Sequence, residues 1–200
     1  MAWRARREQE GSSGAASGEP SPWKREDVKS ALIAESHGKC VYCESKLRHV
    51  TFGDVEHRRP KSQFPNEVLA WENLGLACAV CNNAKSDQWS ENSPIVWPFV
   101  DDPSEHVTFV RAFVSGRTAR GKTTVAHTLL DRLELFEQRQ RVVDDVVLQL
   151  DGVRRIADTR HRAIQWRAVK DSRSPSDQYF ACFSTYLATR SGEFEPTVGS

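Results

Sequence analysis

Four cysteines form two closely spaced pairs, and these side chains are the ones in the chain best suited to bind a metal ion. Cys40 and Cys43 form one C-x-x-C pair, and Cys78 and Cys81 form a second pair, with 34 residues between the two pairs. Two such pairs supply four thiolates, which is the ligand set of a closed tetrahedral zinc site. A redox dithiol is the alternative for a single pair, but it predicts a β-α-β pattern that this sequence lacks. We therefore predict a structural Zn²⁺ bound by all four cysteines.

Acidic, imidazole and basic side chains lie between and just after the cysteine pairs. They occur in three short motifs: D-V-E-H-R-R-P-K at 54–61, W-E-N-L at 71–74 and N-N-A-K at 82–85. Hydrolysis of a phosphodiester needs a base that activates water, a cation that offsets the developing negative charge, and donors that hold the phosphate. His57 is the histidine of these motifs that stands beside a carboxylate, and imidazole titrates near neutral pH. We therefore assign the role of general base to His57.

In their order along the chain, these motifs resemble the HNH endonuclease family. The matching parts are the first cysteine pair, the acid-His-x-x-Pro run, the Asn of W-E-N-L and the second cysteine pair followed by N-x-x-K, together about residues 37–90. The resemblance implies an α+β fold. Its core would be a zinc-stapled ββα-metal (HNH) unit, in which a hairpin and a helix form the site, followed by a helical C-terminal region.

The resemblance also implies a role for the other polar residues of the motifs. Glu56 and Asn82 would bind one catalytic divalent ion, Mg²⁺ or Mn²⁺, through oxygen atoms. Asn73 would orient the loop that carries His57. Phosphate and nucleic-acid contacts would come from four cations: Lys85, Arg58, Arg59 and Lys61. Asn82 stands where the family commonly has His, which keeps an oxygen donor but leaves the identity of the metal open.

Asp54 competes with Glu56 for the role of metal ligand. In a regular strand, residues 54 and 56 share one face and His57 lies on the opposite face. A bulge or turn at the motif would bring Glu56 and His57 onto the same side.

The remaining sequence predicts three segments. Residues 1–22 are rich in Gly, Ser and Pro over their second half and predict a flexible arm. Residues 23–105 form the HNH domain, which begins with a helix near 25–35. Residues 106–200 form a mainly helical region that packs, or that contacts a partner or DNA.

Within this last region the sequence predicts a strand at 106–114, because β-branched and aromatic residues are frequent there. An apolar stripe predicts one long helix from about Thr124 to Asp151. Ser174 and Pro175 predict the start of a further helix. The basic segment 153–170 is either a surface for DNA or a solvated or partner-binding helix face.

The segment G-R-T-A-R-G-K-T at 116–123 matches the Walker A pattern of nucleotide-binding loops. A P-loop fold needs several further parallel strands and an acidic magnesium ligand at a strand end. Only 77 residues follow Thr123, and they read as helices. We therefore expect no nucleotide to bind here; an ATPase would depend on Lys122.

The composition excludes several classes of protein. The chain of 200 residues has 28 Lys plus Arg against 27 Asp plus Glu, so it has no global positive field. It has no apolar run near the roughly 18–20 residues that span a bilayer, and no apolar stretch typical of a secretory signal. We expect a cytoplasmic protein with no membrane partner.

The motifs favour a metal-dependent endonuclease that hydrolyses nucleic acid, DNA being the favoured substrate. Their layout looks most like the small HNH nucleases of bacterial anti-phage systems of the retron-associated and Septu types. That resemblance implies a protein partner, an ATPase of the ABC or structural-maintenance (SMC) type. The alternative is a catalytically inactive zinc module that binds nucleic acid or protein, for which replacement of His57 would leave function intact.

Overall fold

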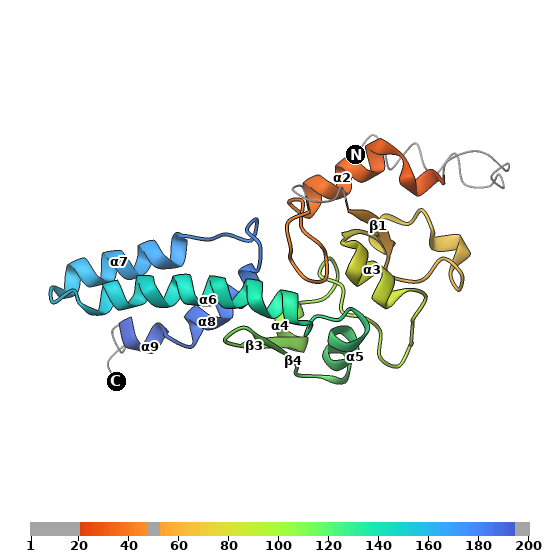
Figure 1. Ribbon diagram of the computed structural model, residues 1–200. Helices are drawn as coiled ribbons and strands as arrows, with labels where there is room; N and C mark the ends of the chain where they lie inside the picture. The colour runs from red at the N-terminus through yellow and green to blue at the C-terminus, as the bar shows by residue number, and fades with distance from the viewer. Residues whose placement is uncertain (1–20, 48–52, 195–200) are drawn as a thin grey trace.

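The computed structural model describes residues 21–47 and 53–194, and Figure 1 shows how their helices and strands are arranged. Most of the predicted arm, residues 1–20, lies outside the described residues. Its last part contributes to a short 3₁₀ turn, η1 (Pro22–Lys24). The described chain combines helices with two small antiparallel sheets, and it confirms the predicted α+β class.

The first group of elements carries the predicted catalytic motifs. It contains α2 (Glu26–Glu35), β1 (Asp54–His57), η2 (Pro65–Glu67), η3 (Trp71–Asn73), β2 (Leu74–Ala77) and α3 (Ala79–Lys85). Strands β1 and β2 are antiparallel and in regular register, with Glu56 opposite Gly75 and His57 opposite Leu74. Together with α3 they form the predicted ββα unit.

The predicted helix near 25–35 corresponds to α2. Val28 and Leu32, one turn apart, bury its inner face. Gly38 ends it with a backbone φ of +68° and a hydrogen bond of 2.7 Å from its N–H to the carbonyl of Ile33. Glycine is favoured at this position because a side chain strains a left-handed residue.

Strand β2 is buried along its whole length, and Trp97 covers it. The closest approach is at Gly75, where an added Cβ would lie 2.6 Å from the indole ring. Gly75 therefore lets Trp97, the largest fully buried side chain of the described residues, pack directly against β2, the strand that pairs with β1.

The predicted strand at 106–114 is instead a hairpin. After the short helix α4 (Pro103–His106), β3 (Val107–Val110) pairs with β4 (Phe113–Gly116), and α5 (Ala119–His127) follows. Arg111 has a φ of +54°, which turns the chain back within one β-rich run. The composition of this segment is correct for a strand, but it does not reveal where the run folds on itself.

The predicted long helix from Thr124 is two helices, because the chain breaks between α5 and α6 (Leu133–Arg154). Leu129 has a φ of +51°, and the N–H of Leu130 binds the carbonyl of Val125 at 3.0 Å, which ends α5. At its far end α6 continues past the exposed Gly152. No helix among the described residues combines the length and the apolar character that crossing a bilayer requires.

The predicted helix at Ser174 begins later. The remaining helices are α7 (Thr159–Asp171), α8 (Phe180–Ala188) and α9 (Ser191–Phe194). Ser174 instead begins a turn that is closed by Asp177. The Asp177 carboxylate accepts a hydrogen bond of 2.8 Å from the backbone N–H of Ser174 and one of 3.0 Å from the Ser174 hydroxyl. This side-chain bonding competes with a helix start, and α8 follows Tyr179.

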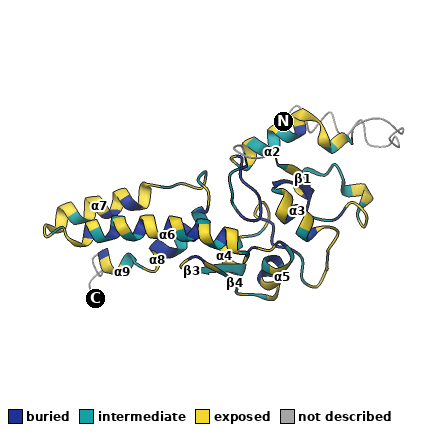
Figure 2. Ribbon diagram, viewed as in Figure 1, coloured by how far each residue is buried: buried dark blue, intermediate teal, exposed yellow. Residues whose placement is uncertain are grey.

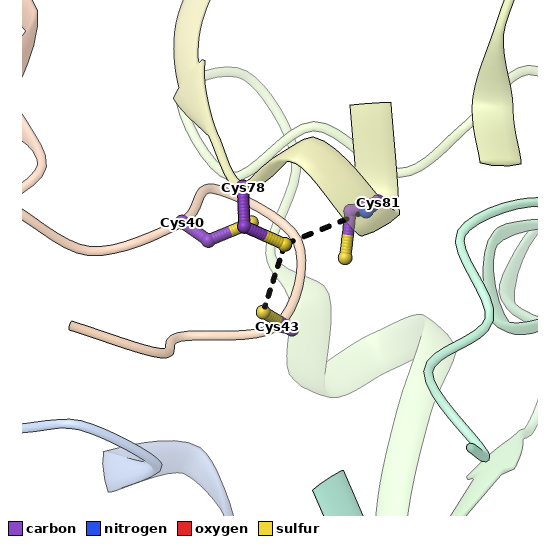
Figure 3. Close-up of side chains that lie close together, drawn as sticks. All are labelled: Cys40, Cys43, Cys78 and Cys81. Carbon is purple, nitrogen blue, oxygen red and sulfur yellow. Dashed lines mark hydrogen bonds between the residues drawn. The ribbon is translucent and has the colours of Figure 1, made fainter. Parts of the chain in front are cut away.

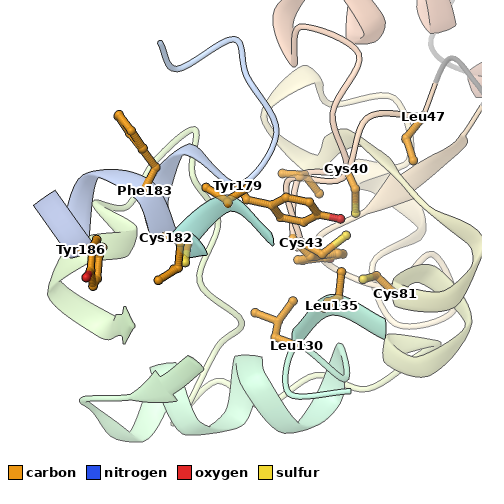
Figure 4. Packing of buried hydrophobic residues seen from close by; sticks show 14 of the residues in the cluster. Cys40, Cys43, Leu47, Cys81, Leu130, Leu135, Tyr179, Cys182, Phe183 and Tyr186 are labelled. Atoms are coloured by element: carbon orange, nitrogen blue, oxygen red, sulfur yellow. The ribbon is translucent and has the colours of Figure 1, made fainter. Parts of the chain in front are cut away.

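One cluster of buried hydrophobic residues includes side chains from both groups of elements, on either side of residue 105. Figure 2 shows buried residues along α6 and α8, which pack together. Figure 4 shows Leu130, Leu135 and Tyr179 beside Cys43, at the place where the helical region meets the cysteine pairs.

Tight packing of α5 on the β3–β4 hairpin explains why the Walker-like segment has glycine at positions 116 and 121. A Cβ at Gly116 would collide with the backbone of Lys122, and a Cβ at Gly121 would collide with the carbonyl oxygen of His106. The N–H of Gly121 already binds the Thr118 hydroxyl at 3.1 Å, and the N–H of Arg117 binds His106 at 2.7 Å. These donors are used within the fold, whereas a phosphate loop directs its donors at the nucleotide.

This packing predicts opposite effects for two Gly→Ala substitutions. Gly121→Ala lowers the free energy of unfolding by about 1–3 kcal/mol, because the added methyl overpacks the contact with His106. Gly152→Ala is the matched control: it sits in a helix with open space around it and is neutral or stabilising by about 0.5–1 kcal/mol. Urea unfolding measures both, and millimolar ATP leaves the melting temperature of the native chain unchanged. An ATP-induced rise that Lys122→Ala abolishes would contradict this account of the segment.

Candidate active site and metal centre

The four cysteine sulfurs lie together at the junction of two segments (Figure 3). Cys40 and Cys43 come from the loop after α2, Cys78 is the N-cap of α3, and Cys81 lies within that helix. All four sulfurs are within 4.8 Å of one another, and those of Cys43 and Cys78 are 3.9 Å apart. A tetrahedral Zn²⁺ with bonds of about 2.3 Å needs sulfurs ~3.8 Å apart. The cluster therefore fits the predicted structural zinc.

The four thiols shift one another's pKa in opposite directions. Hydrogen bonding from Cys40 lowers the pKa of Cys78 to about 7 and holds that of Cys43 well below its usual range, whereas burial raises the pKa of Cys40. Against a lowering hydrogen bond from Cys40, hydrogen bonding with Cys43 and Cys78 and burial also raise the pKa of Cys81. Metal binding requires all four thiols to be deprotonated, and it is therefore linked to the release of protons.

Arg132, the N-cap of α6, places a positive charge beside the cluster. Its guanidinium donates to the sulfur of Cys81 at 3.4 Å and to that of Cys78 at 3.9 Å. Burial opposes its charge, but attraction to Cys81 raises the pKa of Arg132. Four thiolates and one Zn²⁺ carry a net charge of −2, which a guanidinium partly offsets. The helical region thus contributes directly to the metal centre.

Glu56 lies at the bottom of the site in a buried network of three side chains. One of its oxygens, Oε1, pairs with the Lys85 ammonium at 2.7 Å and accepts a hydrogen bond from the Tyr42 hydroxyl at 3.0 Å. Burial raises the pKa of Glu56, although Lys85 and Tyr42 both oppose that rise. Lys85 is 1% exposed and also donates to the backbone carbonyl of His57 at 2.7 Å. This geometry directs Lys85 inward, away from a position where it could touch a phosphate in solvent.

His57 follows Glu56 and lies at the edge of the same cleft. Its Nε2 lies 3.0 Å from the carbonyl oxygen of Val68, and its ring meets the edge of Trp23 at a centroid distance of 5.3 Å. Because a carbonyl oxygen only accepts, Nε2 carries the proton and Nδ1 carries the basic lone pair. Burial lowers the pKa of His57 to about 4, so the imidazole is neutral at pH 7. A neutral imidazole is the form that can accept a proton from water.

Asn73 binds the loop that follows His57. Its Oδ1 accepts a hydrogen bond of 2.7 Å from the backbone N–H of Arg59. Its Nδ2 donates to the carbonyl oxygens of Arg59 at 3.2 Å and Glu67 at 3.1 Å. One buried amide therefore holds both ends of the segment between His57 and η2.

A cleft of about 370 Å³ brings several of the predicted residues together. Its lining includes Glu56, His57, Lys61 and Asn82, together with the carboxylate residue Asp87. Strand β1 pairs with β2 in regular register, so it has no bulge that would bring Glu56 and His57 onto one side. Asp54 and Glu56, two positions apart, share a face of the strand. Asp54 is exposed, outside the cleft lining, and accepts a hydrogen bond of 3.4 Å from the Asn82 amide.

Aromatic side chains contact the cations of the first motif. The Lys61 ammonium lies 4.9 Å from the ring centroid of Trp23. The Arg59 guanidinium pairs with the Glu67 carboxylate at 2.8 Å and lies 5.2 Å from the ring of Phe64 and 5.5 Å from that of Trp89. Arg58 turns toward Asp101, whose carboxylate is 3.8 Å away.

Comparison with known protein families finds a match for this part of the chain. Residues 40–88 match the HNH endonuclease family. The match covers both cysteine pairs and the residues that line the cleft.

The chain is also similar to two Septu proteins PtuB. It is 39% identical to that of Bacillus thuringiensis over 115 residues, which cover 57% of this chain and 45% of the relative. It is 29% identical to that of Bacillus mycoides strain KBAB4, with 66% of this chain and 57% of the relative covered. The chain thus spans about half the length of these curated relatives.

Four residues around the HNH domain were not among the predicted site residues. Tyr42 lies inside the first C-x-x-C pair, where its position beside the metal ligands was a usable sign. The other three residues belong to no motif. In the folded chain Trp23 contacts His57, Asp87 lines the cleft and Arg132 binds Cys81. Single-sequence reasoning has no means of pairing such residues.

Removal of the metal should unfold the HNH domain. We expect one zinc per chain by elemental analysis and a loss of helical and tertiary signal when a strong chelator is added, since four clustered cysteines have no other cross-link. Cys78→Ser should reduce zinc content and stability, while Cys182→Ser, in α8 and outside the cluster, should retain the zinc. Full stability of the metal-free chain would contradict a structural role.

Loss of the buried ion pair between Lys85 and Glu56 should lower the stability of the fold strongly. Lys85→Met leaves the Glu56 carboxylate buried without its cation and should lower the free energy of unfolding by about 3–5 kcal/mol. Lys61→Met, at an exposed position, should change it by less than about 0.5 kcal/mol. In a double-mutant cycle, adding Glu56→Gln should recover part of the loss. Independent, additive effects would show that the pair is not coupled.

Proposed function

We propose that this protein is a metal-dependent HNH endonuclease that hydrolyses phosphodiester bonds of nucleic acid, with DNA as the favoured substrate. One observation carries the proposal: within the segment that matches the family, a single cleft is lined by Glu56, His57 and Asn82. A base and two oxygen donors are the groups that a hydrolytic site of this kind needs.

In this proposal His57 is the general base. The carbonyl of Val68 holds the imidazole with Nε2 protonated, so Nδ1 accepts the proton of the attacking water. The low pKa of His57 keeps this nitrogen free at neutral pH. Asn73 acts at a distance from the reaction by fixing the loop between residues 58 and 67.

Glu56 and Asn82 are the proposed ligands of a divalent ion, Mg²⁺ or Mn²⁺, which would stabilise negative charge on the phosphate and on the leaving oxygen. Their fit rests on two oxygen donors that line the same cleft. The Lys85 ammonium on Glu56 Oε1 acts as a positioning group that holds the carboxylate at the cleft floor. Asp54, hydrogen-bonded to the Asn82 amide, orients the second ligand.

Nucleic-acid contacts are proposed for two cations of the motif. Lys61 is exposed and lines the cleft, so it can reach phosphate oxygens. Arg59 is half-buried and pairs with the Glu67 carboxylate at 2.8 Å, so it would have to exchange this partner for a phosphate. Arg58 is half-buried and close to Asp101, so its contribution is smaller than the motif implies. The exposed basic residues of α7 are a further candidate contact surface.

The cellular role is proposed from the relatives. Similarity to Septu proteins PtuB supports a role in anti-phage defence in the cytoplasm. We propose that a partner ATPase of the ABC or SMC type accompanies the nuclease, and that the C-terminal helices α6 and α7 bind it. Copurification with such a partner that persists after removal of residues 159–171 would argue against α7 as its contact.

Plasmid nicking tests the nuclease directly. Purified protein should convert supercoiled plasmid to nicked circles with Mg²⁺ or Mn²⁺, and His57→Ala should reduce the rate at least about 100-fold, as expected for loss of a general base. His37→Asn, at an exposed histidine that follows α2 and lies outside the cleft lining, is the matched control and should retain activity, because Asn tolerates the positive φ at this position. Equal cleavage by wild type and His57→Ala would reject this mechanism and favour the inactive zinc module.

A further inference from the structure

A second cavity, of about 310 Å³, lies between the zinc loop and the helical region and is separate from the catalytic cleft. Its walls come from the cysteine loop, β3, α6 and α8. They include Tyr42, Val107, Phe109, Leu130, Arg139 and Thr185. Cavities of roughly 300 Å³ and more, with mostly apolar walls and a few polar groups, are typical of sites for small molecules.

Arg139 is the buried charged group of this cavity that has no carboxylate partner. Burial lowers the pKa of Arg139, and the thiols of Cys182 and Cys43 partly oppose that fall. Arg139 is 2% exposed, and its guanidinium donates one hydrogen bond of 2.7 Å to the carbonyl of Leu130. Its other recorded contact is the ring of Phe109, at 5.2 Å. No carboxylate of residues 21–47 or 53–194 forms an ion pair with it.

The carboxylates at this cavity have other partners. The Glu44 carboxylate binds the Lys39 ammonium at 2.9 Å and accepts a hydrogen bond of 2.9 Å from the backbone N–H of Ala181. Glu35 is exposed and accepts a hydrogen bond of 3.3 Å from the Trp71 indole. Neither carboxylate is therefore an ion-pair partner of Arg139.

Burying a cation without a carboxylate or phosphate partner is costly, because the cation loses its hydration and gains no ion pair in return. A guanidinium carries five N–H donors in a planar fork, and one of them is used here. The fork matches a carboxylate or a phosphate, which can accept two parallel hydrogen bonds. The surrounding apolar wall would hold the rest of such a molecule.

We propose that this cavity binds a small organic anion, with a carboxylate or phosphate group on Arg139 and an apolar body against Phe109, Val107 and Leu130. The molecule would contact the Cys40–Glu44 loop and helix α8 at once. Its binding would join the HNH domain to the helical region. The proposal does not depend on nuclease activity, because His57 and Asn82 line the other cleft.

Calorimetric titration of the zinc-loaded full chain tests the proposal, with octanoate, octyl phosphate and octanol as probes. We expect at least one anion to bind and to raise the melting temperature, and octanol to bind about tenfold more weakly or not at all. The stronger of the two anions identifies the headgroup. Failure of both anions to bind would overturn the proposal.

Two variants locate the binding. Arg139→Gln should weaken the anion about tenfold or more, while Arg141→Gln, exposed on the same helix, should not change the dissociation constant. Ser184→Phe fills the cavity and keeps the guanidinium, so it should also abolish binding, and it decides the matter should Arg139→Gln not fold. Zinc content and circular dichroism report folding. Anion affinity that is unchanged in folded Ser184→Phe would place the binding elsewhere and reject this site.

Discussion

Convergence of four sulfurs on one point is the constraint on which the rest of this structure depends. The first group of elements is small, its strands are only four residues long, and much of its connecting chain is irregular. A two-stranded hairpin has marginal stability in water without further packing. The cysteine cluster joins the loop after α2 to the start of α3, and this fixes the strand that carries Glu56 and His57 between them.

The cleft that contains Glu56 and His57 then depends on buried polar groups that bind one another. Lys85 pairs with Glu56 and donates to the backbone carbonyl of His57, and Tyr42 donates to Glu56. Asn73 binds the loop that follows His57. Such a network is stable only when its members are satisfied together. Beside these buried groups, Lys61 is the exposed cation of the cleft lining.

Much of this could be predicted from the sequence, for identifiable reasons. Cysteine spacing specifies a metal site because ligand geometry is strict, and residue order around His57 indicates the ββα unit. The break at Leu129, the hairpin turn at Arg111 and the late start of α8 could not be predicted, because tertiary packing and side-chain bonding of Asp177 override local patterns there. The buried position of the Lys85 side chain could not be predicted either, because a motif specifies a residue type and not the direction of its side chain.

The position of Arg132 has a consequence for how this domain can be transferred between proteins. A zinc-bound nuclease unit that carried its own charge compensation could be fused to unrelated partners with little change. Here the guanidinium next to the sulfurs comes from Arg132, the N-cap of α6, and the Tyr179 hydroxyl, just before α8, binds Ser45 beside Cys43 at 2.9 Å. A chimaera that exchanged the helices for those of another protein would lose both contacts and would have to replace them at the metal centre.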